Sequence, residues 1–390
     1  MEPIECRDVL VQNALFTGDL EAVQKHFTES AAVNLIIESK GDELRWTSRK
    51  LAGRASLDCL RHLLLRGAAV DFAPGGKTAL HEACAAARTD CVRLLLSSGA
   101  DPKTVSEAGH QPLHLCKSPA SIQCAKLLLE HGASVNSQTE EEEDTALHVA
   151  ARHGLEEHVQ LFLRHGAGLE AKNEEGQTPL NAACAQAHPP QDTERYYHVC
   201  QQLVQSGADV DAADRDQQRP LHLACKNASA RVVELLLAHG ASVNIMSYSG
   251  NTAMHNILQV AAYKLGHRPE LVVRALLNHG SIRIWPGALI KVLRYCCSSP
   301  RTIEVLINSY DRVRVTDEWA EAVPAEIVQK HPDFYESLFS LGQRPRSLQH
   351  LARCALRSYL EGRLLQVLPK LHLPSSLHQF LLLSFEDVLY

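Results

Sequence analysis

Apolar and polar residues follow one another along the chain in a pattern that predicts pairs of short helices. In the stretch that begins at Thr78, Leu80 and Cys84 fall on one face of a first helix. Val92 and Leu96 belong to the apolar stripe of a second helix. Neither short helix buries its stripe alone, so we expect such pairs to stack on one another around a shared core.

The same pattern recurs with a nearly constant period. Segments of the type Thr-Pro-Leu-His open the copies, and a Gly-Ala step follows the leucine-rich run of most of them. The openings are spaced by 33, 34, 33, 41 and 33 residues and begin at Thr78, Gln111, Thr145, Thr178, Arg219 and Thr252. This period, together with the two signatures, resembles the ankyrin repeat. The resemblance implies an all-α-dominated repeat solenoid whose surface binds other proteins.

Weaker copies extend the predicted array at both ends. Ala14–Phe27, Ser56–Asp71 and Pro286–Tyr310 have the pattern of a helix or helix pair without the opening signature. Degenerate units are typical of the ends of an array, since terminal repeats face solvent on one side. We therefore predict about eight ankyrin repeats over residues 8–343, with degenerate terminal copies, and a separate C-terminal domain over residues 344–390.

The segment from Pro345 to Gly362 carries an apolar stripe of a different kind. Leucine and alanine side chains recur there at helical spacing, at Leu348, Leu351, Ala352, Ala355 and Leu356. From the residues alone, two interpretations stay open. The stripe either seals the end of the repeat array or forms a binding surface for another protein.

This segment and the one that follows it together resemble the SOCS box, a small helical domain. In that family a helix of the pattern Ser/Thr-Leu-x-x-Leu-Cys-Arg-x-x-Ile-Arg binds elongin C, and a later Leu-Pro-Leu-Pro segment selects Cullin-5. The resemblance assigns elongin C binding to Leu348, Leu351, Ala352 and Leu356, and cullin binding to Leu371, Leu373, Pro374 and Leu377. Ala352 replaces the usual cysteine and His372 the first proline. We expect elongin binding to be weakened rather than abolished, and the selection of Cullin-5 by the second motif to be less secure than elongin binding.

The two parts together resemble the ankyrin repeat and SOCS box family. The resemblance implies a non-catalytic substrate-recognition subunit of an E3 ubiquitin ligase. Its partners would be elongin C, elongin B, Cullin-5 and the RING protein of that cullin, and its ankyrin repeats would hold an unknown protein substrate. An alternative stays open, in which the chain is an ankyrin scaffold or inhibitor that binds partners without recruiting a ligase.

Two features of the repeats are candidates for substrate binding. The connection before Thr145 is acidic. We expect its carboxylates to bind a basic segment of a partner protein, and they belong to Glu141, Glu142, Glu143 and Asp144. Extra residues in Leu180–Gly207 and Met254–Gly280 predict two exposed loops on one edge of the array, and Tyr196 and Tyr197 lie by the first. The alternatives are a solvated acidic turn and tolerated variation in loop length.

Composition and charge narrow the function further. The 39 Lys and Arg residues against 45 Asp and Glu residues give a net charge of −6, which favours neither nucleic acid nor a membrane as a partner. The N-terminal residues lack the basic and apolar layout of a signal peptide, and no apolar run is long enough for a membrane span. We therefore expect an intracellular protein, in the cytoplasm and also in the nucleus.

The cysteines and histidines fit the repeat fold better than a reaction. Cys84, Cys184 and Cys225 share one position of the repeat, as expected for small buried side chains, and no Cys-x-x-Cys pair offers a zinc site. His81 and its equivalents recur at the repeat period, where the resemblance implies hydrogen bonds between neighbouring repeats. No nucleophile, base and orienting group form a pattern. We therefore expect no catalytic residues, cofactor or metal.

Overall fold

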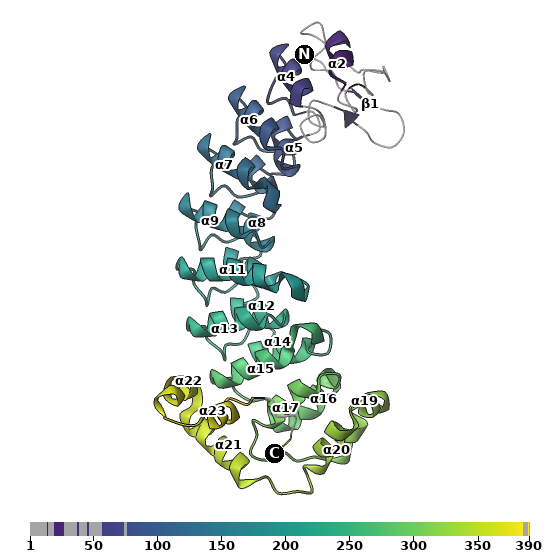
Figure 1. The fold of residues 1–390 in the computed structure, drawn as a ribbon, viewed down its shortest axis with the longest axis vertical. Coiled ribbons are helices and arrows are strands. Elements are labelled where there is room, and N and C mark those ends of the chain that lie inside the picture. The colour runs from purple at the N-terminus through teal and green to yellow at the C-terminus, as the bar shows by residue number, and fades with distance from the viewer. Residues whose placement is uncertain are drawn as a thin grey trace. The chain divides into compact units, whose positions relative to one another are not determined.

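The computed structural model describes residues 14, 19–26, 37–38, 45–46, 57–73, 76–384 and 389. The chain divides into two compact units, Met1–Pro179 and Leu180–Tyr390. The predicted start of the array at residue 8 and part of its first weak copy lie outside the described residues, as do residues 385–388 and 390 at the other end. Within each unit, short helices lie side by side in successive pairs (Figure 1).

The regular structure in the described part of the first unit is helical apart from one short β-ladder and an isolated bridge between Gln138 and Thr145. Strands β1 (Ile37–Glu38) and β2 (Arg45–Trp46) pair in antiparallel register, with Ile37 opposite Trp46. The helices in the described part of this unit are α2 (Leu20–His26), α4 (Leu57–Leu65), α5 (Ala79–Ala85), α6 (Thr89–Ser97), η2 (Pro112–Leu115), η3 (Pro119–Ser121), α7 (Ile122–Glu130), α8 (Ala146–Arg152) and α9 (Glu156–Arg164).

The predicted apolar stripes form the core of this unit. Leu80 and Cys84 of α5 and Val92 of α6 are completely buried. Burial in apolar surroundings raises the pKa of the Cys84 thiol well above its usual range, so this side chain acts as a small hydrophobe. The residues that share its position, Cys184 and Cys225, are also buried.

The histidine of the repeat signature links neighbouring repeats, as predicted. His81 Nδ1 lies 3.2 Å from the Thr78 amide nitrogen, and His81 Nε2 lies 3.0 Å from the His110 carbonyl oxygen. Because an amide only donates and a carbonyl only accepts, the ring carries its proton on Nε2. His148 repeats the arrangement, with Nε2 donating to the Gln177 carbonyl at 2.9 Å. Burial lowers the pKa of both imidazoles, which keeps them in this neutral form.

One repeat departs from the paired α-helices that its sequence predicts. Its first helix, η2, is a 3₁₀ segment of four residues, whereas α5 and α8 have seven. Pro119 follows closely, and the residue before a proline disfavours helical backbone. Ser118 accordingly has φ −132° and ψ 153°, so the helix ends early.

The second unit continues the helix pairs and ends in the predicted C-terminal domain. Its paired helices are α10 (Pro179–Ala185, which starts at the boundary) with α11 (Thr193–Gln205), α12 (Pro220–Lys226) with α13 (Ala230–Ala238), α14 (Ala253–Val260) with α15 (Pro269–Asn278), and α16 (Leu289–Cys296) with α17 (Pro300–Ile307). Short 3₁₀ turns precede three of these helices: η4 (Pro190–Asp192), η5 (Leu265–His267) and η6 (Pro286–Ala288). Helices α18 (Asp317–Glu321), α19 (Ala325–Lys330) and α20 (Pro332–Ser340) follow.

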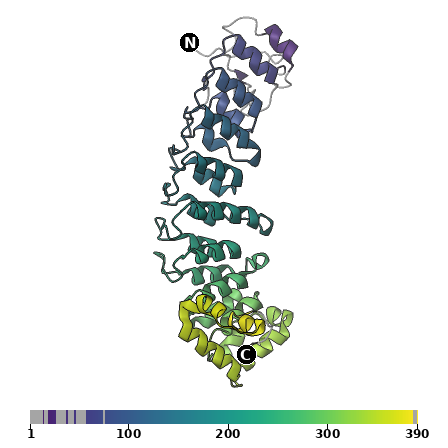
Figure 2. The ribbon, with the colours of Figure 1, turned by 60° about the vertical axis from the view of Figure 1, so that its left-hand side comes forward.

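The C-terminal segment packs against the last helix pairs of the same unit. It consists of α21 (Leu348–Leu360), η7 (Glu361–Arg363), α22 (Leu364–Val367), η8 (Leu368–Lys370) and α23 (Ser375–Leu381). Figure 1 shows these helices beside α15 and α17, and in Figure 2, from another direction, their yellow ribbons again lie against the green end of the unit. The Asn278 side-chain amide donates to the Leu382 carbonyl at 3.1 Å, which ties α15 to the end of α23.

In the described part of the chain, no group of three or more His, Cys, Asp or Glu side chains is arranged to hold a metal ion. No described helix combines the length and the apolar character needed to cross a membrane.

Candidate functional site

The first helix of the C-terminal segment exposes its apolar stripe. The Ser347 hydroxyl accepts a hydrogen bond from the His350 amide at 3.1 Å and caps the start of α21. Leu348 in the first turn is 86% exposed and Tyr359 in the last is 78% exposed. Between them, Ala352 and Ala355 are exposed, and Leu351 and Leu356 are half-buried. The stripe therefore does not seal the end of the array, so that interpretation is wrong.

The opposite face of α21, which packs on the repeats, combines the polar side chains of His350 and Arg353 with the apolar Cys354 and Leu360. His350 and Arg353 are buried. His350 Nε2 donates to the Tyr310 carbonyl at 2.7 Å, and Arg353 Nη2 donates to the Asn308 carbonyl at 3.3 Å. The Arg353 guanidinium also lies 4.3 Å from the centre of the Phe380 ring of α23. Because Asn308 terminates α17, a cation here satisfies a helix C-terminus.

Arg357, one turn further along α21, makes the corresponding contacts with α15. Its Nη1 donates to Asn278 Oδ1 at 2.8 Å and to the Leu381 carbonyl at 2.6 Å, and its Nη2 donates to the Leu277 carbonyl at 3.0 Å. Burial, with a smaller contribution from the like charge of Arg353, lowers the pKa of Arg357 to about 10. The guanidinium remains charged at neutral pH and holds three parts of the unit together.

The second sequence motif is also accessible. Leu371 is 37% exposed and Leu377 is 40% exposed. Pro374, at the start of α23, is exposed, and Leu373 is half-buried. His372, which stands where the motif has proline, is exposed as well. All four residues assigned to cullin binding therefore have solvent-accessible surface.

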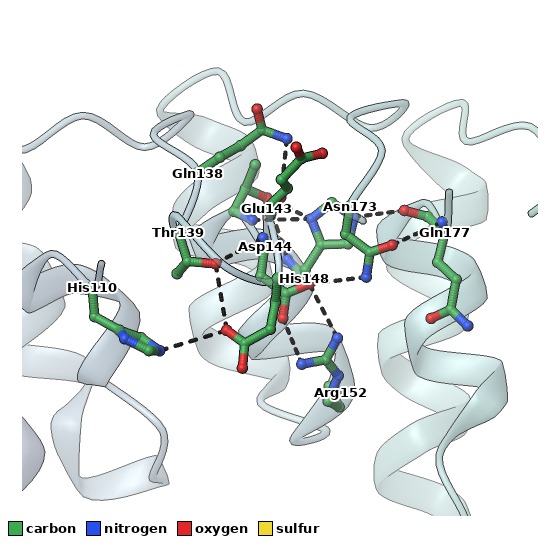
Figure 3. Close-up of polar contacts among 11 residues, drawn as sticks. His110, Gln138, Thr139, Glu143, Asp144, His148, Arg152, Asn173 and Gln177 are labelled. Carbon is green, nitrogen blue, oxygen red and sulfur yellow. Dashed lines mark hydrogen bonds and ion pairs between the residues drawn. The ribbon is translucent and has the colours of Figure 1, made fainter. Parts of the chain in front are cut away.

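The acidic turn before α8 is only partly exposed. Glu141, Glu142 and Glu143 are exposed, but Asp144 is 1% exposed. Asp144 Oδ2 accepts from Arg152 Nη1 at 2.5 Å, and Asp144 Oδ1 accepts from Arg152 Nη2 at 3.0 Å (Figure 3). The expectation that Asp144 offers its charge to a partner is corrected, because Arg152 on the following helix draws the carboxylate inward.

Asn173 on the next connection completes the interactions of Asp144. Its side-chain amide donates to Asp144 Oδ1 at 3.0 Å, as Figure 3 shows. Asn173 Oδ1 in turn accepts from the Gln177 amide at 2.9 Å. Asp144 therefore joins two successive repeats through side chains that are 35% exposed or less, which is a structural role.

The exposed part of the acidic turn extends over neighbouring turns of the same unit. The Glu140 amide donates to the Gly109 carbonyl at 3.3 Å, and the Glu174 amide donates to the Glu142 carbonyl at 2.9 Å. These bonds place successive hairpin tips next to one another. They add the exposed carboxylates of Glu107, Glu140, Glu174 and Glu175 to the surface. Glu140 belongs to the acidic connection that the sequence already marked, whereas we did not predict Glu107, Glu174 and Glu175, although one glutamate or more at each hairpin tip was a readable signal.

The two inserted loops contact each other. The His188 ring of the first loop stacks on Tyr196 at 4.5 Å and meets the His267 ring of the second loop edge to face at 5.7 Å. Tyr196 is 6% exposed, so its ring anchors a loop and is not free for a substrate. Tyr197 is half-buried, with the Arg231 guanidinium 4.0 Å from its ring centre.

Comparison with known proteins identifies both parts of the chain. A family model of ankyrin repeats in three copies matches residues 50–139, 113–214 and 191–286, and a model of the SOCS box matches residues 344–382. Ankyrin repeat and SOCS box protein 16 of Mus musculus is 44% identical over 98% of this chain and 87% of its own length. Ankyrin repeat and SOCS box protein 10 of Homo sapiens is 53% identical over 90% of this chain and 76% of its own length.

A solved structure gives a further comparison. The human ASB11 ankyrin repeat domain shares 27% sequence identity and covers 54% of this chain and 91% of its own, with a TM-score of 0.48. The two family matches and the full-length relatives confirm the helical ankyrin repeat fold and the C-terminal SOCS box that the sequence predicts. The chain therefore belongs to the ankyrin repeat and SOCS box protein family.

Proposed function

We propose that the chain is a non-catalytic substrate-recognition subunit of an E3 ubiquitin ligase that acts inside the cell, in the cytoplasm and the nucleus. Family membership and the SOCS box support a substrate-receptor role in general. We propose elongin C, elongin B, Cullin-5 and its RING protein as the partners. In this proposal, ankyrin repeats over residues 8–343 hold the substrate, and the SOCS box over residues 344–390 recruits the ligase.

The observation that carries the proposal is the reversed burial of α21. A helix that packs on its own protein normally turns its apolar stripe inward. Here Arg353 and His350 are buried together with Cys354 and Leu360, while Leu348 and Tyr359 stay exposed. Burying one leucine stabilises a complex by about 1.5–3 kcal/mol, and a continuous stripe of such side chains is typical of a protein interface. We assign Leu348, Leu351, Ala352 and Leu356 to elongin C on this ground.

The proposed mechanism requires no bond chemistry from this chain. A substrate held on the repeats and a ubiquitin-conjugating enzyme held through the cullin would belong to one assembly. The lysines of the substrate would then meet the charged enzyme at a much higher effective concentration than in free solution. Leu371, Leu373, Pro374 and Leu377 would select the cullin.

We propose the exposed hairpin tips of the first unit as one substrate contact. Glu141, Glu142 and Glu143 lie next to the exposed carboxylates of the neighbouring tips. Such a run of negative charge attracts a basic segment of another protein. Replacing the three glutamates with lysine should remove one or more partners, and an unchanged set of partners would argue against this contact. Tyr197 stays a candidate at the edge of the inserted loops.

Affinity purification of the tagged full-length protein tests the ligase proposal. The test variant is Leu348→Asp, and the matched control is Tyr263→Asp, whose side chain is 85% exposed in the second inserted loop. We expect elongin B, elongin C and Cullin-5 to purify with the unmodified protein and the control. The test variant should recover roughly tenfold less or lower, because a carboxylate would enter an apolar pocket. Elongins absent from all three preparations would favour the ankyrin scaffold alternative.

A further inference from the structure

Large exposed apolar side chains outside the SOCS box are unevenly distributed. In the described part of the chain before residue 344, two of them lie in the first unit, Leu65 and Val105. The others fall in one stretch of the second unit and are Met246, Tyr248, Tyr263, Leu265, Ile282, Trp285 and Tyr295. Single exposed apolar residues are ordinary, but a concentration of them marks an interaction surface.

A shortened connection explains why part of this stretch is uncovered. Several other hairpin tips hydrogen-bond to the next one, as when the Tyr248 amide donates to the Asp216 carbonyl at 3.0 Å. The connection after α15 leads directly into η6 at Pro286. Among the described residues, it forms no hairpin tip that hydrogen-bonds to the tip at Tyr248. Tyr248 is consequently 75% exposed and Met246 60% exposed.

The side chain of Asn244 holds the connections that follow α13 and α15 next to each other. Asn244 Nδ2 donates to the Gly280 carbonyl at 3.0 Å, and Asn244 Oδ1 accepts from the Ile282 amide at 2.8 Å. Met246 and Trp285 lie two and three residues beyond this junction along their own stems. The connections that carry Met246, Tyr248, Ile282 and Trp285 are therefore neighbours, whereas Tyr263 and Leu265 belong to the inserted loop between α14 and α15.

A cavity of about 670 Å³ opens at the same junction. Val243 and Ile282 line it on the repeat side, and Ser358 and Glu361 line it on the SOCS box side. This volume accommodates more than one side chain of a bound segment. The hydrogen bonds of Asn244 to the Gly280 carbonyl and of Arg357 to the Leu277 carbonyl join residues that line the cavity and hold its walls in place.

Positive charge predominates in this cavity. Arg283 and Arg357 both line it, and Glu361 is the one acidic residue among the lining side chains. Arg283 is exposed, and its Nη1 donates to the Ser309 carbonyl at 2.7 Å. The contacts that the described residues offer these two guanidinium groups are with carbonyl, amide and ring atoms. A guanidinium has five N–H donors in a fork that matches a carboxylate, so Arg283 retains donors for an incoming anion.

We propose that this cavity and its rim bind an extended segment of a partner protein in which an aspartate or glutamate stands next to an aromatic or aliphatic residue. The carboxylate would pair with Arg283, and the apolar neighbour would cover Ile282, which lines the cavity, and the exposed Trp285 three residues along the same connection. The identification of this partner as a substrate rests on the proposed function. A segment bound here would lie beside α21, the helix that we propose recruits the ligase.

Fluorescence anisotropy with three peptide pools tests the proposal on the full-length protein. The pools share random flanks and carry Asp-Phe, Lys-Phe or Asp-Ser at the centre. We expect the Asp-Phe pool to bind roughly tenfold more tightly than either of the others, since one charge pair and one buried ring are each worth about that much. Equal binding of the three pools would overturn the proposal without any variant.

Variants locate the binding. Arg283→Gln and Ile282→Asp should each weaken the Asp-Phe pool roughly tenfold, and Tyr263→Asp, which lies outside the cavity lining, should not. Unchanged affinity in the first two variants, or equal loss in all three at matched melting temperatures, would place the binding elsewhere and overturn the proposal.

Elongin C recovery from the same preparations separates the cavity proposal from the ligase proposal. Peptide binding without recovery of elongin C would contradict only the ligase proposal. Recovery of elongin C without peptide binding would contradict only the cavity proposal.

Discussion

Arg357 in the SOCS box donates a hydrogen bond to the carbonyl of Leu277, which lies 80 residues earlier in the sequence, at 3.0 Å. Leu277 belongs to the last turn of α15, where carbonyls have no partner within their own helix. The guanidinium supplies that partner and places its charge at the negative end of the helix dipole. The contact fixes α21 by its polar face and so leaves the apolar face for another protein.

Replacing Arg357 with lysine should loosen the SOCS box without removing the charge. A lysine ammonium cannot reach Asn278, Leu277 and Leu381 with the geometry of a planar fork. We expect a loss of about 1–3 kcal/mol in the free energy of unfolding of this region. Hydrogen exchange of the amides in α21 and α23 measures it. The exposed Arg363→Lys is the control, and equal protection in both variants would contradict the assigned role.

The turn after α15 should tolerate only glycine. Gly280 has φ +87°, and a Cβ built on it would lie 2.7 Å from the Gly362 Cα. Gly240 has nearly the same φ, +86°, with nothing within 4 Å of its Cβ position. Gly240→Ala should therefore cost only about 1–2 kcal/mol of backbone strain, and Gly280→Ala should cost clearly more. Urea denaturation of the two variants gives the difference, and equal losses would show that the SOCS box does not press on this turn.

Asp144 and Glu141 should behave differently although they are close in sequence. Asp144→Ala leaves Arg152 and the buried Asn173 without their carboxylate and should cost about 2–3 kcal/mol of stability. Glu141→Ala removes an exposed charge and should change stability by less than about 0.5 kcal/mol. Denaturation midpoints of the two variants provide the measurement. A similar small effect in both would mean that Asp144 is a surface residue after all.

Stability should fall when the solution becomes moderately acidic. Burial lowers the pKa of His158 from 6.5 to about 4, so between these values the unfolded chain binds more protons than the folded one. The contribution of this histidine is complete above pH 6.5 and is lost as the pH falls toward 4, by roughly 1–3 kcal/mol. His158→Gln should flatten this part of the stability profile, whereas a profile of unchanged slope would exclude His158 as the titrating group.

Restoring the cysteine of the SOCS box pattern should strengthen elongin C binding. Ala352 is exposed on α21, so Ala352→Cys changes little in the isolated protein. In the proposed complex the added sulfur would be buried and contribute about 1 kcal/mol, or roughly a fivefold gain in affinity. Calorimetric titration with elongin B/C measures it. The matched substitution Ala355→Cys tests whether the gain is specific to this position. A gain at both positions would indicate a nonspecific increase in affinity.

The sequence by itself determined much of the architecture. The period of the Thr-Pro-Leu-His segments, the buried positions of Leu80 and Cys84 and the inter-repeat role of His81 all follow from local pattern, because each repeat solves the same packing problem in the same way. The two SOCS box motifs were likewise readable, since their residues are close in the chain. Helical spacing placed Leu348 and Leu356 on one stripe.

The tertiary structure alone decided which way these side chains face. Periodicity shows that residues share a face, but it does not show what that face meets. The stripe of α21 turns outward because carbonyls at the ends of α15 and α17, distant in sequence, bind Arg353 and Arg357. Asp144 turns inward for the same kind of reason, since Arg152 and Asn173 reach it from elements on either side. A buried polar group goes where its hydrogen-bonding partners are, and the fold places those partners.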